Sequence, residues 1–78
     1  MHFVYILRCS DETLYTGCTS DLDERLLRHN SGAVPSTKLR LPVALLTYIA
    51  FTDKYKAFEF EKYLKGGSGR AFLKKHFI

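Results

Sequence analysis

The chain has 78 residues, about half the length of an average domain, so we expect one domain over residues 1–78 and no separate module for recognising a substrate. Its 46% apolar and 26% charged residues are typical of a globular protein and argue against disorder, while its small size argues against a deep enclosed pocket. The formal net charge is +4 and no acidic residue follows Glu61, so the C-terminal part suits a polyanion or an anionic membrane surface.

The first predicted element is a β-hairpin over residues 2–18. Its two halves, HFVYILRC and TLYTGC, are rich in aromatic and β-branched residues and are separated by the polar residues 10–12. If the connection has an odd number of residues, Leu7 faces Tyr15. Tyr5 and Tyr15 then lie on one face of the sheet, as diagonal neighbours about 7 to 8 Å apart.

A helix is predicted from about residue 20 to residue 30. Segment 19–21 supplies a hydroxyl cap, acidic residues occupy the first turn, and Asn30-Ser31-Gly32 ends the helix. Helical spacing places Arg25 and His29 on one stripe of its surface. Residues 31–42 lack periodicity and hold two prolines, so we expect an exposed connection that carries Lys38 and Arg40.

Residues 43–51 are nearly all apolar and are predicted to form a third strand, at the centre of the sheet. Thr52-Asp53 caps a second helix, which runs to Lys65 and ends at Gly66-Gly67. A short third helix is expected from Ser68 to about residue 76. The order ββαβαα predicts an α/β protein of the α+β type, in which helices flank a three-stranded, mainly antiparallel sheet.

Two cysteines, Cys9 and Cys18, are too few for a disulfide scaffold and lack the spacing of a zinc site. The longest nearly apolar run, residues 43–51, is too short to span a membrane, and the N-terminus lacks the pattern of an export signal. We therefore expect a cytoplasmic protein with reduced thiols and no membrane span.

The two tyrosine motifs resemble those that name the GIY-YIG nuclease domain. The first reads FVY at residues 3–5 and the second YTG at residues 15–17, so both tyrosines and the last glycine match, while the first glycine is absent. Six motifs occur in order over nearly the whole chain, which makes the resemblance specific, nearest to the small single-domain bacterial members. The other four are Arg25-x3-His29, Thr37-Lys38-x-Arg40-x-Pro42, Ala57-x3-Glu61-x2-Leu64-Lys65 and Ser68-x-Arg70.

The resemblance implies a metal-dependent DNA endonuclease, a hydrolase of phosphodiester bonds. It also implies that Glu61 is the protein ligand of one divalent cation. A single carboxylate suits Mg²⁺, which retains most of its waters, and we expect Mn²⁺ to substitute for it. Composition alone instead favours an i,i+4 ion pair between Glu61 and Lys65. The implied catalytic residues are Tyr5, Tyr15, Arg25, His29 and Glu61.

The chemistry of these side chains suggests a division of roles. The guanidinium of Arg25 has a planar fork that matches two phosphate oxygens. Tyr5 is the candidate general base, although a phenol with a reference pKa of about 10 needs nearby positive charge. Tyr15 or His29 could instead orient the water or relay its proton, and the sequence leaves this assignment open. Gly17 is expected to leave room for a backbone or a phosphate to approach the tyrosine edge.

Cations outside the catalytic set are expected to follow the DNA backbone, and the chain lacks a motif for reading a long base sequence. We therefore expect branched, flapped or single-stranded DNA as the partner, in DNA repair or recombination. The chain departs from the family at Cys18, where some members have lysine, and has no asparagine beyond Asn30. A noncatalytic nucleic-acid-binding module, or one that depends on a protein partner, is therefore the alternative. The expected DNA-binding residues are Lys38, Arg40, Lys65, Arg70 and Lys74.

Overall fold

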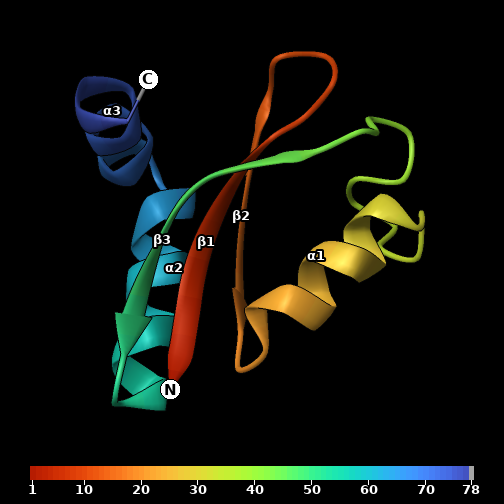
Figure 1. Ribbon diagram of the computed structural model, residues 1–78. Coiled ribbons are helices and arrows are strands. Elements are labelled where there is room, and N and C mark those ends of the chain that lie inside the picture. The colour runs from red at the N-terminus through yellow and green to blue at the C-terminus, as the bar shows by residue number, and fades with distance from the viewer. Residues whose placement is uncertain (78) are drawn as a thin grey trace.

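The computed structural model describes residues 1–77 and contains six elements in the order ββαβαα (Figure 1). This order and the antiparallel sheet confirm the predicted α+β fold class. Among residues 1–77, no helix has the length and apolar character needed to cross a membrane. The strands are β1 (His2–Arg8), β2 (Leu14–Thr19) and β3 (Ala44–Phe51), and the helices are α1 (Leu22–Asn30), α2 (Lys54–Lys65) and α3 (Gly67–His76).

The strand order is β2-β1-β3, so the prediction that the third strand is central was wrong. Strand β1 is central, and residues 4–7 within it are all buried. Strand β3 is an edge strand in which Leu45 and Tyr48 remain exposed. Both strands are rich in apolar residues. They differ in burial, because helices cover both faces of β1.

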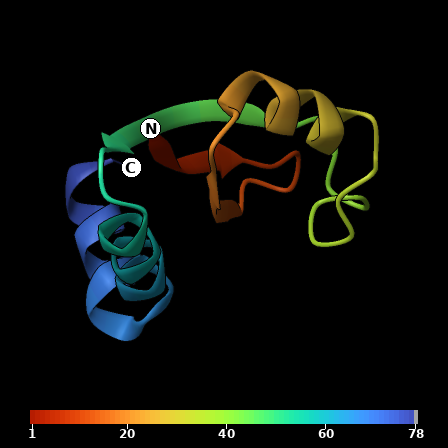
Figure 2. The same ribbon diagram turned by 90° about the horizontal axis from the view of Figure 1, so that it is seen from below.

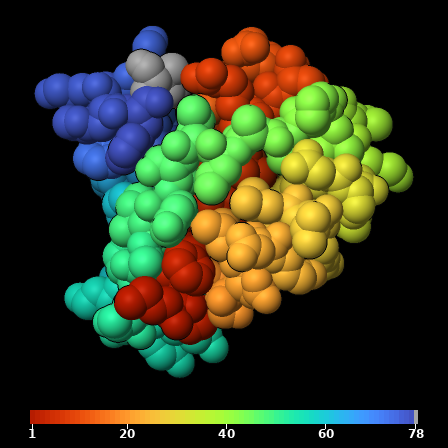
Figure 3. Space-filling model, viewed as in Figure 1, coloured from red at the N-terminus to blue at the C-terminus, as the bar shows by residue number. Residues whose placement is uncertain are grey.

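Two apolar clusters lie on opposite faces of β1, because successive side chains of a strand point to opposite sides. Val4 and Ile6 pack against α2 and α3 on one face. Tyr5 and Leu7 face the other side, which α1 and the connection before β3 cover (Figure 2). In the space-filling view, β1 shows through a hollow between β3 and α1 (Figure 3).

The register of the hairpin agrees with the prediction. Leu7 is the partner of Tyr15, and Tyr5 is the partner of Gly17. Tyr5 and Tyr15 are therefore diagonal neighbours on one face, and their ring centroids are 6.3 Å apart.

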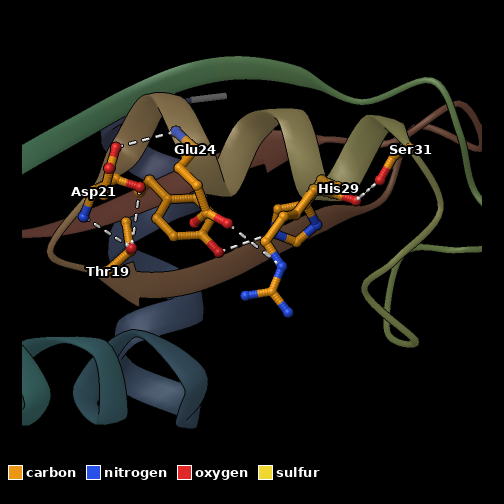
Figure 4. Close-up of polar contacts among 7 residues, drawn as sticks. Thr19, Asp21, Glu24, His29 and Ser31 are labelled. Carbon is orange, nitrogen blue, oxygen red and sulfur yellow. Dashed lines mark hydrogen bonds and ion pairs between the residues drawn. The ribbon is translucent and has the colours of Figure 1, made fainter.

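Helix α1 begins at Leu22, two residues later than predicted, and its cap is a carboxylate instead of a hydroxyl. The Asp21 carboxylate accepts a hydrogen bond from the backbone N–H of Glu24 at 3.1 Å (Figure 4). The Thr19 hydroxyl accepts a bond from the Asp21 N–H and so shapes the entry to the helix. Asp21 reaches the third helical N–H, the usual target of a capping side chain.

The connection between α1 and β3 is less exposed than predicted. Thr37 is fully buried in it. Arg40 extends back to the hairpin turn, where its Nη1 donates to the Thr13 hydroxyl at 2.7 Å and its Nη2 donates to the Ser36 carbonyl at 2.6 Å. Leu41 packs against the second apolar cluster, so part of this aperiodic segment is covered, although Lys38 and Leu39 are exposed.

Candidate active site

Three buried side chains form a continuous hydrogen-bond chain at the centre of the site. The Tyr5 hydroxyl is 2.8 Å from Nε2 of His29, and Nδ1 of His29 is 2.7 Å from the Thr37 hydroxyl. All three side chains are 0% exposed. They come from β1, the last turn of α1 and the following connection, so the site depends on the packing of all three segments.

The half-buried Tyr15 ring completes an aromatic trio. Its centroid is 5.1 Å from the His29 ring, and the Tyr5 and His29 centroids are 5.7 Å apart. Both contacts are edge-to-face, the arrangement that aromatic rings favour. The rings of Tyr5, Tyr15 and His29 are therefore in mutual contact.

Burial has opposite effects on the pKa of Tyr5 and of His29, because it disfavours the charged form of each. It raises the pKa of Tyr5 to about 12, although the nearby Arg25 guanidinium opposes the shift. It lowers the pKa of His29 below 6.5, and the charges of Arg25 and Arg28 lower this pKa further. At pH 7 the phenol is therefore protonated and the imidazole neutral, with one ring nitrogen as donor and the other as acceptor.

We expect His29 to titrate below pH 6.5 when its ring protons are followed by NMR. The unfolded chain takes up this proton at a higher pH than the folded chain. The contribution of the neutral His29 to the free energy of unfolding is therefore fully present above pH 6.5, and it is lost as the pH falls toward the lowered pKa. The free energy of unfolding falls by about 1.4 kcal/mol for each pH unit that separates the pKa of His29 in the unfolded chain from that in the folded chain. Thermal unfolding of wild type and His29→Gln across this window tests the assignment. An equal pH dependence in both proteins would contradict it.

The ring of Tyr5 leaves no space for a side chain at position 17, which is a glycine. A Cβ at Gly17 would overlap Cζ and the hydroxyl of the Tyr5 side chain, which is fully buried and has no room to move. The group that lies close to this glycine is therefore the Tyr5 side chain, in place of the expected backbone or phosphate.

Gly17→Ala is expected to lower the free energy of unfolding by about 1–3 kcal/mol, the usual cost of overpacking a core. The melting temperature should then fall by roughly 4–8 °C for each kcal/mol. Gly67→Ala is the matched control, because a Cβ at Gly67 meets no atom within 4 Å. Calorimetry of both variants checks the prediction, which fails if the two melt alike.

Arg25 lies on α1 beside the aromatic trio, one helical turn before His29. Its side chain is half-buried, and within residues 1–77 its buried Nε has no hydrogen-bond partner. A buried polar atom without a partner is costly, which makes it a candidate for contact with a ligand. A phosphate oxygen is a suitable acceptor for this group.

Glu61 reaches the same region from α2. Its carboxylate is 3.2 Å from Nζ of Lys65, so the i,i+4 ion pair favoured by composition is present. Cys18 lies within electrostatic range of both Glu61 and Arg25. Burial raises the pKa of its thiol, and Glu61 raises it further while Arg25 lowers it. Arg25 on α1 and Glu61 on α2, the two charged residues that the resemblance implies, therefore both lie near Cys18.

Few protein side chains are available to bind one metal ion together. Within the described part of the chain, no three His, Cys, Asp or Glu side chains gather closely enough to hold an ion together. Any ion held by the half-buried Glu61 carboxylate would therefore not draw on a cluster of three such side chains. This fits Mg²⁺, which retains several waters and needs one or two carboxylates besides substrate oxygens.

The predicted DNA-binding residues do not form a single patch. Lys65 and Arg70 lie together beside Tyr15 and line a cleft of about 450 Å³. Lys38 and Arg40 lie in the connection before β3, on the opposite side of the molecule from α3, which carries Lys74 (Figures 1 and 2). Arg40 is also engaged in holding the hairpin turn.

Thr37 is the site residue whose role the sequence did not reveal. The sequence places Thr37 in the Thr-Lys motif of the connection and indicates no contact for it. Its hydroxyl binds Nδ1 of His29 and so fixes the orientation of the ring. A threonine in an aperiodic polar segment carries no sign of burial, and its place in the Thr-Lys motif was the available signal.

Relatives and a solved structure resemble this chain over most of its length. The UPF0213 protein of Lactococcus lactis subsp. cremoris is 49% identical over 65 residues, which cover 82% of this chain and 66% of that protein. UPF0213 protein YsiG of Lactococcus lactis subsp. lactis is 51% identical, with coverage of 82% and 62%. The chain thus spans slightly less than two thirds of these two relatives.

The solution NMR structure of the UPF0213 protein BH0048 from Bacillus halodurans has a similar fold, with a TM-score of 0.60 at 36% identity. The match covers 95% of this chain and 82% of that one. The family model described as the GIY-YIG catalytic domain matches residues 1–75. On the tyrosine, arginine and glutamate positions described above and on this match, the chain belongs to the GIY-YIG catalytic domain family.

Proposed function

We propose that residues 1–78 form a nuclease domain that hydrolyses DNA phosphodiester bonds with the help of a divalent cation. The observation that carries this proposal is the buried chain Tyr5–His29–Thr37 beside Arg25, whose Nε has no partner within residues 1–77. The proposed substrates are branched, flapped or single-stranded DNA, and the proposed setting is DNA repair or recombination. The residues proposed to act in catalysis are Tyr5, Tyr15, Arg25, His29 and Glu61.

In this proposal Tyr5 is the general base, but it never becomes a free phenolate. It takes a proton from the attacking water while its own proton passes to Nε2 of His29, 2.8 Å away. This route forms a buried imidazolium in place of a buried phenolate, and it requires an imidazole that starts neutral, as the lowered pKa of His29 provides. Thr37 accepts the Nδ1–H bond and keeps Nε2 free as an acceptor.

Access of water to Tyr5 is the condition for this route. The Tyr5 side chain is fully buried in the absence of DNA, so binding of the substrate has to open a path to its hydroxyl. Tyr15 is half-buried and lies against the His29 ring, and we assign to it the orientation of the water. Tyr5→Phe should therefore abolish proton transfer, whereas Tyr15→Phe should weaken positioning.

The two charged residues would act on the phosphate. Arg25 would bind two of its oxygens and stabilise the charge that grows on them. Glu61 would hold the divalent cation together with water, after release of its ion pair with Lys65. When bound, such an ion supplies Lewis-acid stabilisation of the phosphoryl and leaving oxygens.

A noncatalytic or partner-dependent nucleic-acid-binding module is the second candidate. It is favoured by the Glu61–Lys65 ion pair at 3.2 Å, which occupies the one carboxylate proposed for the metal, and by Cys18 at the position of a family lysine. Such a module would bind DNA equally well after Glu61→Ala and would cut none.

Cleavage of end-labelled DNA separates the two candidates. Duplex, single-stranded, flapped and four-way DNA are incubated with Mg²⁺ or Mn²⁺, beside an EDTA control and the Glu61→Ala protein. The nuclease predicts metal-dependent cuts that disappear in Glu61→Ala. Binding without cuts by the wild type would reject it in favour of the module.

A further inference from the structure

A cleft of about 450 Å³ opens beside the proposed active site, between β2 and the pair α2–α3. Its apolar wall and floor come from three elements: Leu14 on β2, Leu64 on α2 and Leu73 on α3. The size falls within the range of about 300–1,000 Å³ that is usual for ligand sites. The proposed reaction uses Tyr15 at its border but does not use the cleft itself.

The charged residues of the cleft are both cationic. Lys65 and Arg70 line it, and both are exposed. Nζ of Lys65 is 5.9 Å from the centroid of the Tyr15 ring and 3.2 Å from the Glu61 carboxylate, so it joins the cleft to the site. Apolar walls with two cations at the opening match the chemistry of a nucleotide, which has a flat apolar face and a charged phosphate.

We infer that this cleft receives one unstacked nucleobase of the substrate strand, next to the phosphate that is cut. Lys65 and Arg70 then contact the phosphates that flank this nucleotide. The inference rests on the proposed function in taking DNA as the ligand. It adds a specific requirement, which is an unpaired nucleotide at the cut.

The geometry explains a preference for unpaired DNA without any reading of sequence. A base inside a duplex reaches such a cleft only after unstacking and unpairing, which costs free energy, whereas a flap or a single strand offers it freely. The apolar walls contact the face of a base and leave its hydrogen-bonding edge unread, so all four bases should be accepted.

Binding of a short oligonucleotide without metal tests the cleft directly. Labelled wild-type protein is titrated by NMR with single-stranded oligo(dT), and with a strand of equal length in which every nucleotide is abasic. We expect the amides of Leu14, Thr16 and Leu73 to shift with oligo(dT) alone, and affinity for the abasic strand to be at least about fivefold weaker. Equal shifts and equal affinity for both strands would overturn the inference.

Two pairs of variants localise the effect. Leu14→Trp fills the cleft and should remove the advantage of oligo(dT) over the abasic strand, whereas Tyr48→Trp, on the other edge strand, should keep it. Arg70→Ala should weaken binding of both strands more than Lys54→Ala does. Lys54 lies eleven residues before Lys65 on α2, roughly 16 Å along the helix axis. Retention of the advantage in Leu14→Trp would count against the cleft.

This design separates failure of the inference from failure of the proposed function. If the protein cuts DNA but treats abasic and normal strands alike, the nuclease stands and the cleft is refuted. If it cuts no DNA but still discriminates the two strands, base binding in the cleft holds and the nuclease is refuted.

Discussion

Replacing Arg25 with alanine is expected to slow DNA cleavage about 100- to 1,000-fold, the usual cost of removing one donor from developing charge. The half-buried side chain has a buried Nε for which no partner exists among residues 1–77. Loss of the side chain should therefore break no hydrogen bond of that atom in the DNA-free protein. The effect should appear in the cleavage rate of a protein that remains folded.

Arg25→Lys should restore little of this activity, because an ammonium lacks the planar fork that binds two phosphate oxygens. Arg28→Ala is the matched control: it removes the same charge three residues further along α1, where Arg28 is exposed and lies 3.7 Å from Glu24. Single-turnover cleavage of a flapped substrate by the three variants, with circular dichroism as a test of folding, measures the difference. Wild-type rates in Arg25→Ala would refute the assignment.

The sequence predicted those parts of the fold that depend on local periodicity. The diagonal arrangement of Tyr5 and Tyr15 follows from the side-chain period of a strand and the length of the turn, and the register agrees. The common stripe of Arg25 and His29 and the Glu61–Lys65 ion pair follow from the i,i+4 spacing of a helix. Each of these inferences concerns residues within one hairpin or one helix.

Errors arose where tertiary packing decides. Strand β3 is the longest apolar run, yet β1 is central, because strand order depends on which strand both layers of helices cover. The buried Thr37 hydroxyl meets Nδ1 of His29, and this contact joins two residues that are eight positions apart in the sequence. The approach of Glu61 to the α1 side of the site was expected from family resemblance, since no local pattern links α2 to α1.

Replacing Glu61 with glutamine is expected to reduce metal-dependent cleavage by at least about 100-fold while DNA binding stays the same or increases. The neutral amide keeps the shape of the side chain but is a poor ligand for Mg²⁺, and it releases Lys65 from its ion pair to meet DNA phosphates. Stability should change by at most about 1 kcal/mol, because Lys65 in this pair is largely exposed.

Glu59→Gln is the matched control, since it removes an exposed carboxylate two residues away on the same helix. Binding of Mn²⁺ gives a measurement that does not depend on cleavage: paramagnetic broadening of amide signals should centre on residue 61 in wild type and Glu59→Gln, and disappear in Glu61→Gln. Equal broadening in both variants would remove Glu61 from the metal site. Loss of broadening with unchanged cleavage would instead separate metal binding from the reaction.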